Sequence, residues 1–232
     1  MTVLLLPVHT PGHHLVPLIA AAGVPVVVVD DGSGPSASPV LQEAASHGAT
    51  VLRHSVNRGK GAALKTGFRY IADELPEHDV VCADGDGQHR LDDIQRVSEH
   101  VAARRRMTLG VRSFDGAVPF RSRLGNRVTS QLFRAATGRL LRDTQTGLRG
   151  HRSDQLAWLC SIEGDRFEYE MNVLLAAARA GIPVDEVTIA TVYTGSSKFS
   201  PLSDSARIYW PLLRSLLPQT PVGKVSGSST ST

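Results

Sequence analysis

Short apolar runs alternate with helical apolar spacing along the first half of the chain. The runs are rich in β-branched residues and predict strands buried on both faces, at residues 3–6, 24–29, 50–54, 80–83 and 107–111. The spacing of Leu64, Phe68 and Ile71 predicts the apolar face of a helix between the third and fourth strands. This β-α alternation predicts an α/β domain with parallel strands.

The other predicted elements include further helices, and the regular alternation ends after the fifth predicted strand. Ser38 and Pro39 predict the N-cap and first turn of a helix that Gly48 ends. Further helices are expected near residues 13–22, 91–101, 121–138 and 167–180. Residues 114–120 are loop-like, the polar segment 143–149 predicts a turn, and residues 187–192 predict a late strand.

Two acidic pairs follow predicted strands directly. Asp30 and Asp31 follow the second strand, and Asp84 and Asp86 follow the fourth. Because ligands bind outside the carboxyl ends of parallel strands, both pairs are expected at one ligand-binding edge. Two carboxylates facing a pyrophosphate predict a Mg²⁺ or Mn²⁺ site. The alternative for each pair is an acidic loop after a strand.

A Gly-rich turn precedes the helix that contains Leu64. Its sequence is Asn57-Arg58-Gly59-Lys60-Gly61. Backbone N–H groups at a helix start, together with a lysine, predict an anion site, and a solvated turn is the alternative. The glycine spacing is not that of a Walker loop.

Composition bounds the protein class. The chain has 232 residues, 41% of them hydrophobic, which suits one large domain or two small ones. Its 25 Lys and Arg against 22 Asp and Glu make it only mildly basic, so nucleic acid is not an expected partner. Cys82 and Cys160 lie in apolar contexts without metal spacing and are expected to be reduced core residues of a cytoplasmic protein.

The ends of the chain suggest a soluble protein or one that lies on a membrane. The first residues lack the basic start of a signal peptide, and no stretch reaches the ~18 apolar residues of a spanning helix. Residues 203–219 predict an amphipathic helix with Trp210 and Arg207, and residues 220–232 predict a disordered tail. Residues 203–217 suit contact with the inner face of the cytoplasmic membrane; packing on the domain and a homodimer contact are the alternatives.

In their order along the chain, three motifs resemble those of the family 2 glycosyltransferases. The motifs are residues 28–33, 57–61 and 83–89. The second half resembles the dolichyl- or polyprenyl-phosphate sugar synthase branch, in residues 110–112, 123–126, 143–149, 166–170 and 196–199. The resemblance spans residues 3–209 and implies the GT-A fold, a Rossmann-like, mixed and mostly parallel sheet flanked by helices, as a single domain at residues 1–202.

The resemblance also implies roles for particular residues. Those implied to bind the nucleotide-sugar donor are Pro7, Asp30, Asp31, Asn57, Lys60, Asp84 and Ser197, with Asp84 and Asp86 on the metal. Those implied to act on the sugar, the diphosphate or the acceptor phosphate are Asp86, Gln88, Asp143, Arg112, Arg121, Arg123, Arg149 and Lys198.

Two segments depart from the family pattern. The Asn-Glu pair that usually follows the first strand is replaced here by Val8-His9-Thr10-Pro11-Gly12. The arginine that often precedes the Ser-Lys element is replaced by Tyr193-Thr194-Gly195. The first departure affects the expected donor contacts, and the second affects the expected acceptor contacts.

The chemistry of the acceptor separates the candidate functions. A hydroxyl acceptor needs a general base, for which Glu168, Glu170 and Asp143 are candidates, whereas a phosphate is already ionised and needs cations. The resemblance implies inverting, metal-dependent transfer from a UDP- or GDP-sugar, and the arginines favour a polyprenyl phosphate as the acceptor. The alternatives are transfer to a soluble or polysaccharide hydroxyl, and a nucleotide-sugar binding module without catalysis. A dinucleotide oxidoreductase is excluded because no G-x-G-x-x-G follows the first strand.

Overall fold

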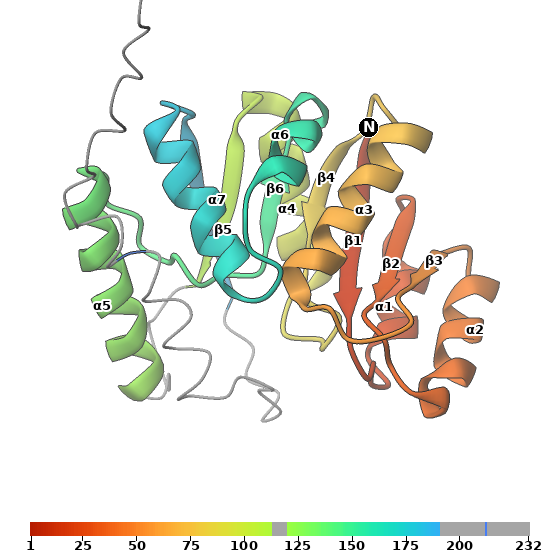
Figure 1. The fold of residues 1–232 in the computed structure, drawn as a ribbon. Coiled ribbons are helices and arrows are strands. Elements are labelled where there is room, and N and C mark those ends of the chain that lie inside the picture. Colours follow the sequence, from red (N-terminus) through yellow and green to blue (C-terminus); the bar gives the residue numbers. More distant parts are fainter. Residues whose placement is uncertain (113–119, 191–211, 213–232) are drawn as a thin grey trace, which may run out of the picture.

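One twisted sheet forms the centre of the molecule (Figure 1). The computed structural model describes residues 1–112, 120–190 and 212, with the backbone alone at 120–124. Its seven strands are β1 (Thr2–Val8), β2 (Val26–Asp30), β3 (Thr50–Arg53), β4 (Asp79–Cys82), β5 (Met107–Arg112), β6 (Arg149–His151) and β7 (Val184–Ile189). They lie in the order β3-β2-β1-β4-β6-β5-β7, and β6 runs antiparallel to both neighbours while the other pairs are parallel.

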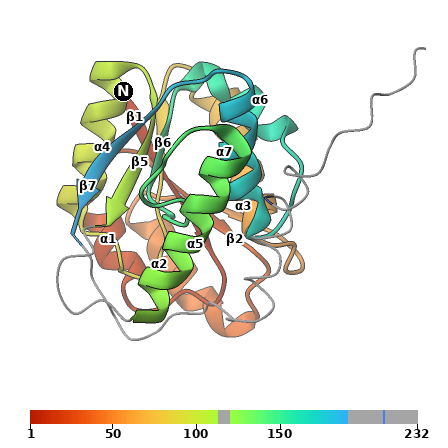
Figure 2. The same ribbon diagram turned by 90° about the vertical axis from the view of Figure 1, so that its left-hand side faces the viewer.

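Helices cover both faces of this sheet (Figure 2). They are α1 (Leu15–Ala21), α2 (Ser38–Ser46), α3 (Lys60–Glu74), α4 (Leu91–Arg104), α5 (Phe120–Thr137), α6 (Leu156–Ser161) and α7 (Glu168–Arg179). In β1, Val3 and Leu5 join the core under α3, α6 and α7, whereas Leu4 and Leu6 join the core under α1, α2 and α4. Successive side chains of a strand point to opposite faces, so a strand covered on both sides needs an unbroken apolar run.

The predicted fold class is confirmed, with corrections at particular elements. The late strand begins at Val184, earlier than expected, and its described part ends at Ile189. Ser38 lies in the first turn of α2 and is not its N-cap, because a short 3₁₀ turn at Pro35–Ala37 precedes it. Both β6 and α6 were unexpected, since three and six residues are too few for a clear periodic signal.

The strand register brings the two acidic pairs to one edge. Val8 of β1 lies beside Asp30, and Leu5 of β1 lies beside Cys82. The chain that leaves β2 and β4 therefore emerges on the same side of the sheet, where it carries Asp31 and Asp84. The strand order reverses direction beside β1, and such a point is where open α/β sheets bind ligands.

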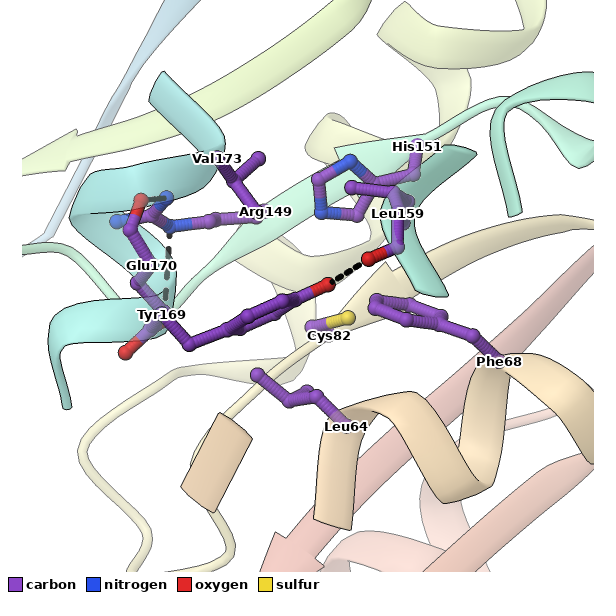
Figure 3. Close-up of a pocket in the computed structure, with 9 residues that line it drawn as sticks. All are labelled: Leu64, Phe68, Cys82, Arg149, His151, Leu159, Tyr169, Glu170 and Val173. Atoms are coloured by element: carbon purple, nitrogen blue, oxygen red, sulfur yellow. Dashed lines mark hydrogen bonds and ion pairs between the residues drawn. The ribbon is translucent and has the colours of Figure 1, made fainter. Parts of the chain in front are cut away.

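A small buried pocket lies between β6, α3, α6 and α7 (Figure 3). The Tyr169 hydroxyl donates to the Leu159 carbonyl across 2.8 Å, and burial raises the pKa of that phenol. Burial, followed by the positive charge of Arg149, lowers the pKa of His151 from 6.5 to about 3. The ring of His151 is therefore neutral in the folded protein at neutral pH. The side chains around the pocket are Leu64, Phe68, Cys82, Arg149, His151, Leu159, Tyr169, Glu170 and Val173.

This buried imidazole predicts a specific pH dependence of stability. As the pH falls below 6.5, the unfolded chain binds a proton at His151 before the folded chain does, so the free energy of unfolding decreases. The slope is about 1.4 kcal/mol per pH unit between the two pKa values. Urea unfolding at pH 7, 6 and 5 should give a shallower decline for His151→Gln than for the wild type. His47→Gln, at an exposed histidine, is the control, and equal slopes for all three proteins would contradict the prediction.

Candidate active site

Asp30 is built into the edge of the sheet. It is fully buried, and its Oδ1 accepts a hydrogen bond from the Ser33 amide at 3.0 Å. Its Oδ2 accepts from Arg53 Nε at 2.9 Å. The Ser33 hydroxyl oxygen in turn accepts from the Thr10 amide at 2.7 Å. Asp30 thus ties the end of β2 to β3, and through Ser33 to the chain after β1.

Asp31 holds the Gly-rich turn in place. Its carboxylate accepts hydrogen bonds from the Arg58 amide at 2.9 Å and the Gly59 amide at 2.7 Å. His54 Nδ1 lies 2.8 Å from the same carboxylate, and its other ring nitrogen lies 2.9 Å from the Thr66 hydroxyl. Burial alone would raise the pKa of Asp31, but these amides and His54 lower it below its ordinary value. His54 was not singled out from the sequence, because nothing local to it shows that it faces an aspartate.

Glycines in the turn allow the segment before α7 to pack closely on the start of α3. Gly59 has a φ of 106°, a conformation that a side chain would strain. A Cβ on Gly59 would overlap the Asp165 carbonyl, and one on Gly61 would meet the Tyr169 side chain. The Ala62 amide donates to the Asp165 carbonyl at 2.9 Å. This packing brings Lys60 next to α7.

Lys60 lies between two carboxylates from different parts of the chain. Its Nζ is 2.7 Å from Asp84 Oδ1 and 3.0 Å from Glu170 Oε2. Burial alone would lower the pKa of Lys60, but the two carboxylates raise it. Burial would likewise raise the pKa of Asp84, but Lys60 and then His89 hold it well below its usual range. Lys60 and Asp84 are therefore both charged at neutral pH.

Arg149 extends this row of charges into the interior. Its Nε lies 3.5 Å from Glu170 Oε1 (Figure 3). The guanidinium also donates to the backbone carbonyls of Thr146, Thr144 and Glu170 at 2.9, 3.1 and 2.7 Å. With 3% of its side chain exposed, Arg149 holds the 144–149 segment against α7, and its expected acceptor role stays a prediction.

Asp86 has different surroundings from Asp84. Its two oxygens accept hydrogen bonds from the Gln88 amide at 3.0 Å and from Gln88 Nε2 at 2.8 Å. The residue is partly exposed, and no ion pair to it occurs among the described residues. Its hard oxygen ligands suit Mg²⁺ or Mn²⁺. No group of three or more His, Cys, Asp and Glu side chains in the described ranges could hold a metal ion.

The approach of Gly147 to Asp84 gives a testable consequence. A Cβ on Gly147 would overlap Asp84 Oδ2. Gly147→Ala should therefore displace the Asp84 carboxylate while the core stays packed, lowering transfer by about a hundredfold with a small change in melting temperature. Gly125→Ala is the control, because the added methyl group has open space around it. Gly138→Ala would not serve, because the positive φ of Gly138 makes any side chain there strained. Equal activity of the two variants would contradict the prediction.

Arg112 and Asp143 form a bidentate pair at the end of β5. Arg112 Nε and Nη2 donate to the Asp143 carboxylate at 2.7 and 3.0 Å. Asp143 is fully buried, and its Oδ1 also accepts from the Gln145 amide at 3.2 Å. The guanidinium is 26% exposed, so Asp143 fixes the direction in which Arg112 meets solvent. This geometry makes Asp143 a holder of Arg112, with its carboxylate buried away from solvent.

The remaining predicted site residues divide by location. Pro7 is half-buried in β1, and Asn57 is exposed at the start of the Gly-rich turn. Arg121 and Arg123 lie in the first turns of α5, where only the backbone is described. Ser197, Lys198 and the membrane contact at 203–217 lie outside the described residues, apart from Leu212, which is buried and belongs to the same core cluster as Val3 and Leu5.

Two side chains next to Asp84 were missed or given another role. His89 Nε2 lies 3.6 Å from Asp84 Oδ2, whereas the sequence suggested that Gln88 and His89 extend the site toward the acceptor. Glu170 was expected only as an alternative base, yet it pairs with Lys60 and Arg149. A Lys in a Gly-rich turn and a Glu at the start of a later helix carry no joint sequence signal, because their contact depends on how α7 packs on α3.

This sheet edge, with acidic strand ends beside a Gly-rich helix start, suits the binding of a nucleotide. The chain belongs to glycosyl transferase family 2, whose family model matches residues 22–157. It is therefore a glycosyltransferase, which uses a nucleotide-sugar donor. The structure of glucosyl-3-phosphoglycerate synthase from Mycobacterium tuberculosis with Mn²⁺, UDP and phosphoglyceric acid superposes with a TM-score of 0.68 at 16% identity, covering 96% of this chain and 81% of that one.

Two sequence relatives are more similar to the chain than that structure is. A protein of Methanocaldococcus jannaschii, MJ1222, is 31% identical over 73% of this chain and 70% of its own length. The UDP-N-acetylglucosamine–dolichyl-phosphate N-acetylglucosaminyltransferase of Methanococcus voltae is 27% identical over 73% of this chain and 75% of its own length. No helix in the described part of the chain is long and apolar enough to cross a membrane.

Proposed function

We propose that this glycosyltransferase transfers a sugar, with inversion, from a UDP- or GDP-linked donor to a polyprenyl phosphate. The observation that carries the proposal is that the three candidate general bases are engaged in other interactions while Arg112 is presented at the site edge. A hydroxyl acceptor needs a carboxylate that can take its proton. A phosphate acceptor is already anionic, so it needs a positioned cation.

Each candidate base has a structural partner. Asp143 is fully buried under Arg112, and Glu170 lies between Lys60 and Arg149. Glu168 Oε1 accepts hydrogen bonds from the Asp165 and Arg166 amides, both at 3.1 Å, as expected for an acid at a helix start. A carboxylate held by such contacts is less available to a substrate hydroxyl. These contacts favour a phosphate acceptor, which is already ionised and has no proton that a base must remove.

The site edge offers groups for both substrates. Arg112, held by Asp143, would meet the acceptor phosphate and aim one of its oxygens at the anomeric carbon of the donor. As that oxygen forms its bond, the bond from the anomeric carbon to the diphosphate breaks, and the diphosphate leaves with the electron pair. Asp86 would hold the Mg²⁺ or Mn²⁺ of the family, which neutralises charge on the diphosphate. Contacts with the phosphates stay predictions for four further residues, which are Arg121, Arg123, Ser197 and Lys198.

Two relatives with lipid-phosphate acceptors in their names support this acceptor class. One is the Methanococcus voltae enzyme, and the other is an undecaprenyl-phosphate 4-deoxy-4-formamido-L-arabinose transferase of Edwardsiella ictaluri, which is 30% identical over 55% of this chain and 39% of its own length. A polyprenyl phosphate lies in a membrane, so the proposal includes peripheral membrane contact through residues 203–217. Transfer to a soluble hydroxyl acceptor remains the alternative.

A matched pair of acceptors tests the proposal. The purified chain with Mn²⁺ would be given UDP- and GDP-sugars together with a short-chain polyprenyl phosphate or the corresponding polyprenol, and products would be identified by mass spectrometry. A glycosyl phosphate from the phosphate, with no product from the alcohol, is the expected result. Equal or faster transfer to the polyprenol or to free sugars would overturn the proposed acceptor class.

A further inference from the structure

The lysine of the Gly-rich turn is already neutralised by carboxylates of this chain. Lys60 Nζ contacts Asp84 Oδ1 at 2.7 Å and Glu170 Oε2 at 3.0 Å, and 15% of its side chain is exposed. A lysine that only awaited a phosphate would have its ammonium in solvent at the helix start. Here the ammonium is bound to the first carboxylate of the Asp84-Gly85-Asp86 pair.

The two carboxylates of that pair are therefore unequal. Asp84 has Lys60 on one oxygen and His89 Nε2 at 3.6 Å from the other. Among the described residues, the Asp86 carboxylate accepts hydrogen bonds only from Gln88. Half of the negative charge that would attract a divalent cation to this edge is already compensated by Lys60.

We propose that Lys60, held by Glu170, is a positioning residue that occupies Asp84 and prevents the acidic pair from binding a divalent cation until a nucleoside diphosphate arrives. The inference rests on the metal-dependent donor binding of the proposed function. Its structural basis is the Lys60 ammonium between Asp84 and Glu170, with Arg149 on the far side of Glu170. Lys60 compensates the negative charge of Asp84, and the diphosphate supplies negative charge in its place. The cation and the donor therefore bind together.

Coulomb interactions give opposite signs for two substitutions in this row. Lys60→Met keeps the length of the side chain and removes its charge, so Asp84 becomes available and the cation should bind more tightly without nucleotide. Glu170→Gln removes a negative charge from the neighbourhood and leaves Lys60 paired with Asp84 alone, so the cation should bind more weakly. Two substitutions that merely loosened the structure would both change the affinity in the same direction.

Lys65→Met provides a matched control. Lys65 lies in the same helix, is also largely buried, and pairs with Asp165 at 3.0 Å. Among the described residues, Lys65 makes no hydrogen bond or ion pair with Asp84 or Asp86. Its substitution thus removes a buried ion-paired lysine of α3 without changing the charge next to Asp84.

Mn²⁺ binding to the full chain, followed by electron paramagnetic resonance of the free ion, tests the inference. Wild type should bind Mn²⁺ at least about tenfold more tightly with UDP or GDP than without it. Lys60→Met should lower the Kd for Mn²⁺ alone by about tenfold, Glu170→Gln should raise it severalfold, and Lys65→Met should leave it unchanged. Circular dichroism would establish that each variant is folded, and Glu170→Gln carries the test if Lys60→Met is not.

Three different results would contradict the inference about Lys60. If Lys60→Met binds Mn²⁺ alone as wild type does but binds UDP or GDP more weakly, Lys60 is a donor ligand and the inference is wrong. If Lys60→Met and Glu170→Gln change the Mn²⁺ affinity in the same direction, the row of charges is only structural. If wild type binds no Mn²⁺ even with nucleotide, the metal dependence in the proposed function fails and the inference fails with it.

Discussion

Asp86→Ala is expected to lower sugar transfer about a thousandfold or more while the protein stays folded. Asp86 is the carboxylate of the acidic pair that remains outside the ion pairs of the described residues. Its loss leaves the developing charge on the leaving diphosphate without its bound cation, because Asp84 is paired with Lys60. Initial rates with saturating donor and Mn²⁺ measure the effect, and a thermal melt measures the stability.

Asp92→Ala is the matched control for that substitution. Asp92 follows Asp86 closely in sequence, but its side chain is 75% exposed and pairs with the exposed Arg90. Such a surface pair contributes little to stability, so activity and melting temperature should both stay close to wild type. Wild-type turnover in the presence of EDTA, or near-normal turnover of Asp86→Ala, would show that the reaction does not depend on a metal at this position.

Arg112→Ala is expected to lower kcat/KM for the acceptor about a hundredfold and to leave donor affinity unchanged. The buried carboxylate of Asp143 holds the Arg112 guanidinium at the site edge. Loss of a bidentate contact to the acceptor phosphate removes both attraction and orientation. Steady-state kinetics with varied acceptor, together with calorimetry of donor binding, separate the two substrates.

Arg105→Ala controls for the loss of a buried ion-pair partner. Arg105 donates to both oxygens of the buried Asp79 at 3.0 and 2.8 Å, as Arg112 does to Asp143, but Asp79 begins β4 at the opposite edge of the sheet. Both variants should lose stability because each leaves a buried carboxylate unpaired. Only Arg112→Ala should show a lower kcat/KM for the acceptor. A parallel fall in donor affinity and turnover for Arg112→Ala would place Arg112 on the donor side.

The order of the main strands and helices could be predicted from the sequence because their signal is local. A run such as Val26–Val29 is apolar at every position, so it can only be a strand covered on both faces. The β6 strand has no such signal. It consists of Arg149–His151 and is buried because β4 and β5 both pair with it. Its antiparallel direction follows from this pairing, and its own three residues do not determine it.

The candidate site was predictable in outline for the same reason. Asp31 and Asp84 each follow a strand, and parallel strands bring their carboxyl ends to one edge. Contacts within the site were not predictable. Asp31 was expected to bind the nucleotide, yet the structure surrounds its carboxylate with His54 and the amides of the Gly-rich turn. Any contact between Asp31 and a nucleotide stays a prediction.

The sequence by itself determined the family, the fold class and the edge of the sheet at which the chemistry is expected. Apolar runs, glycines and strand-end carboxylates act over a few residues, so the printed chain is enough to recognise them. Only the tertiary structure decided which charges meet. Lys60 and Glu170 lie far apart in sequence, and the packing of α7 on the glycines around Lys60 brings them within 3.0 Å. Ion pairs depend on distance in space, and no local pattern encodes that distance.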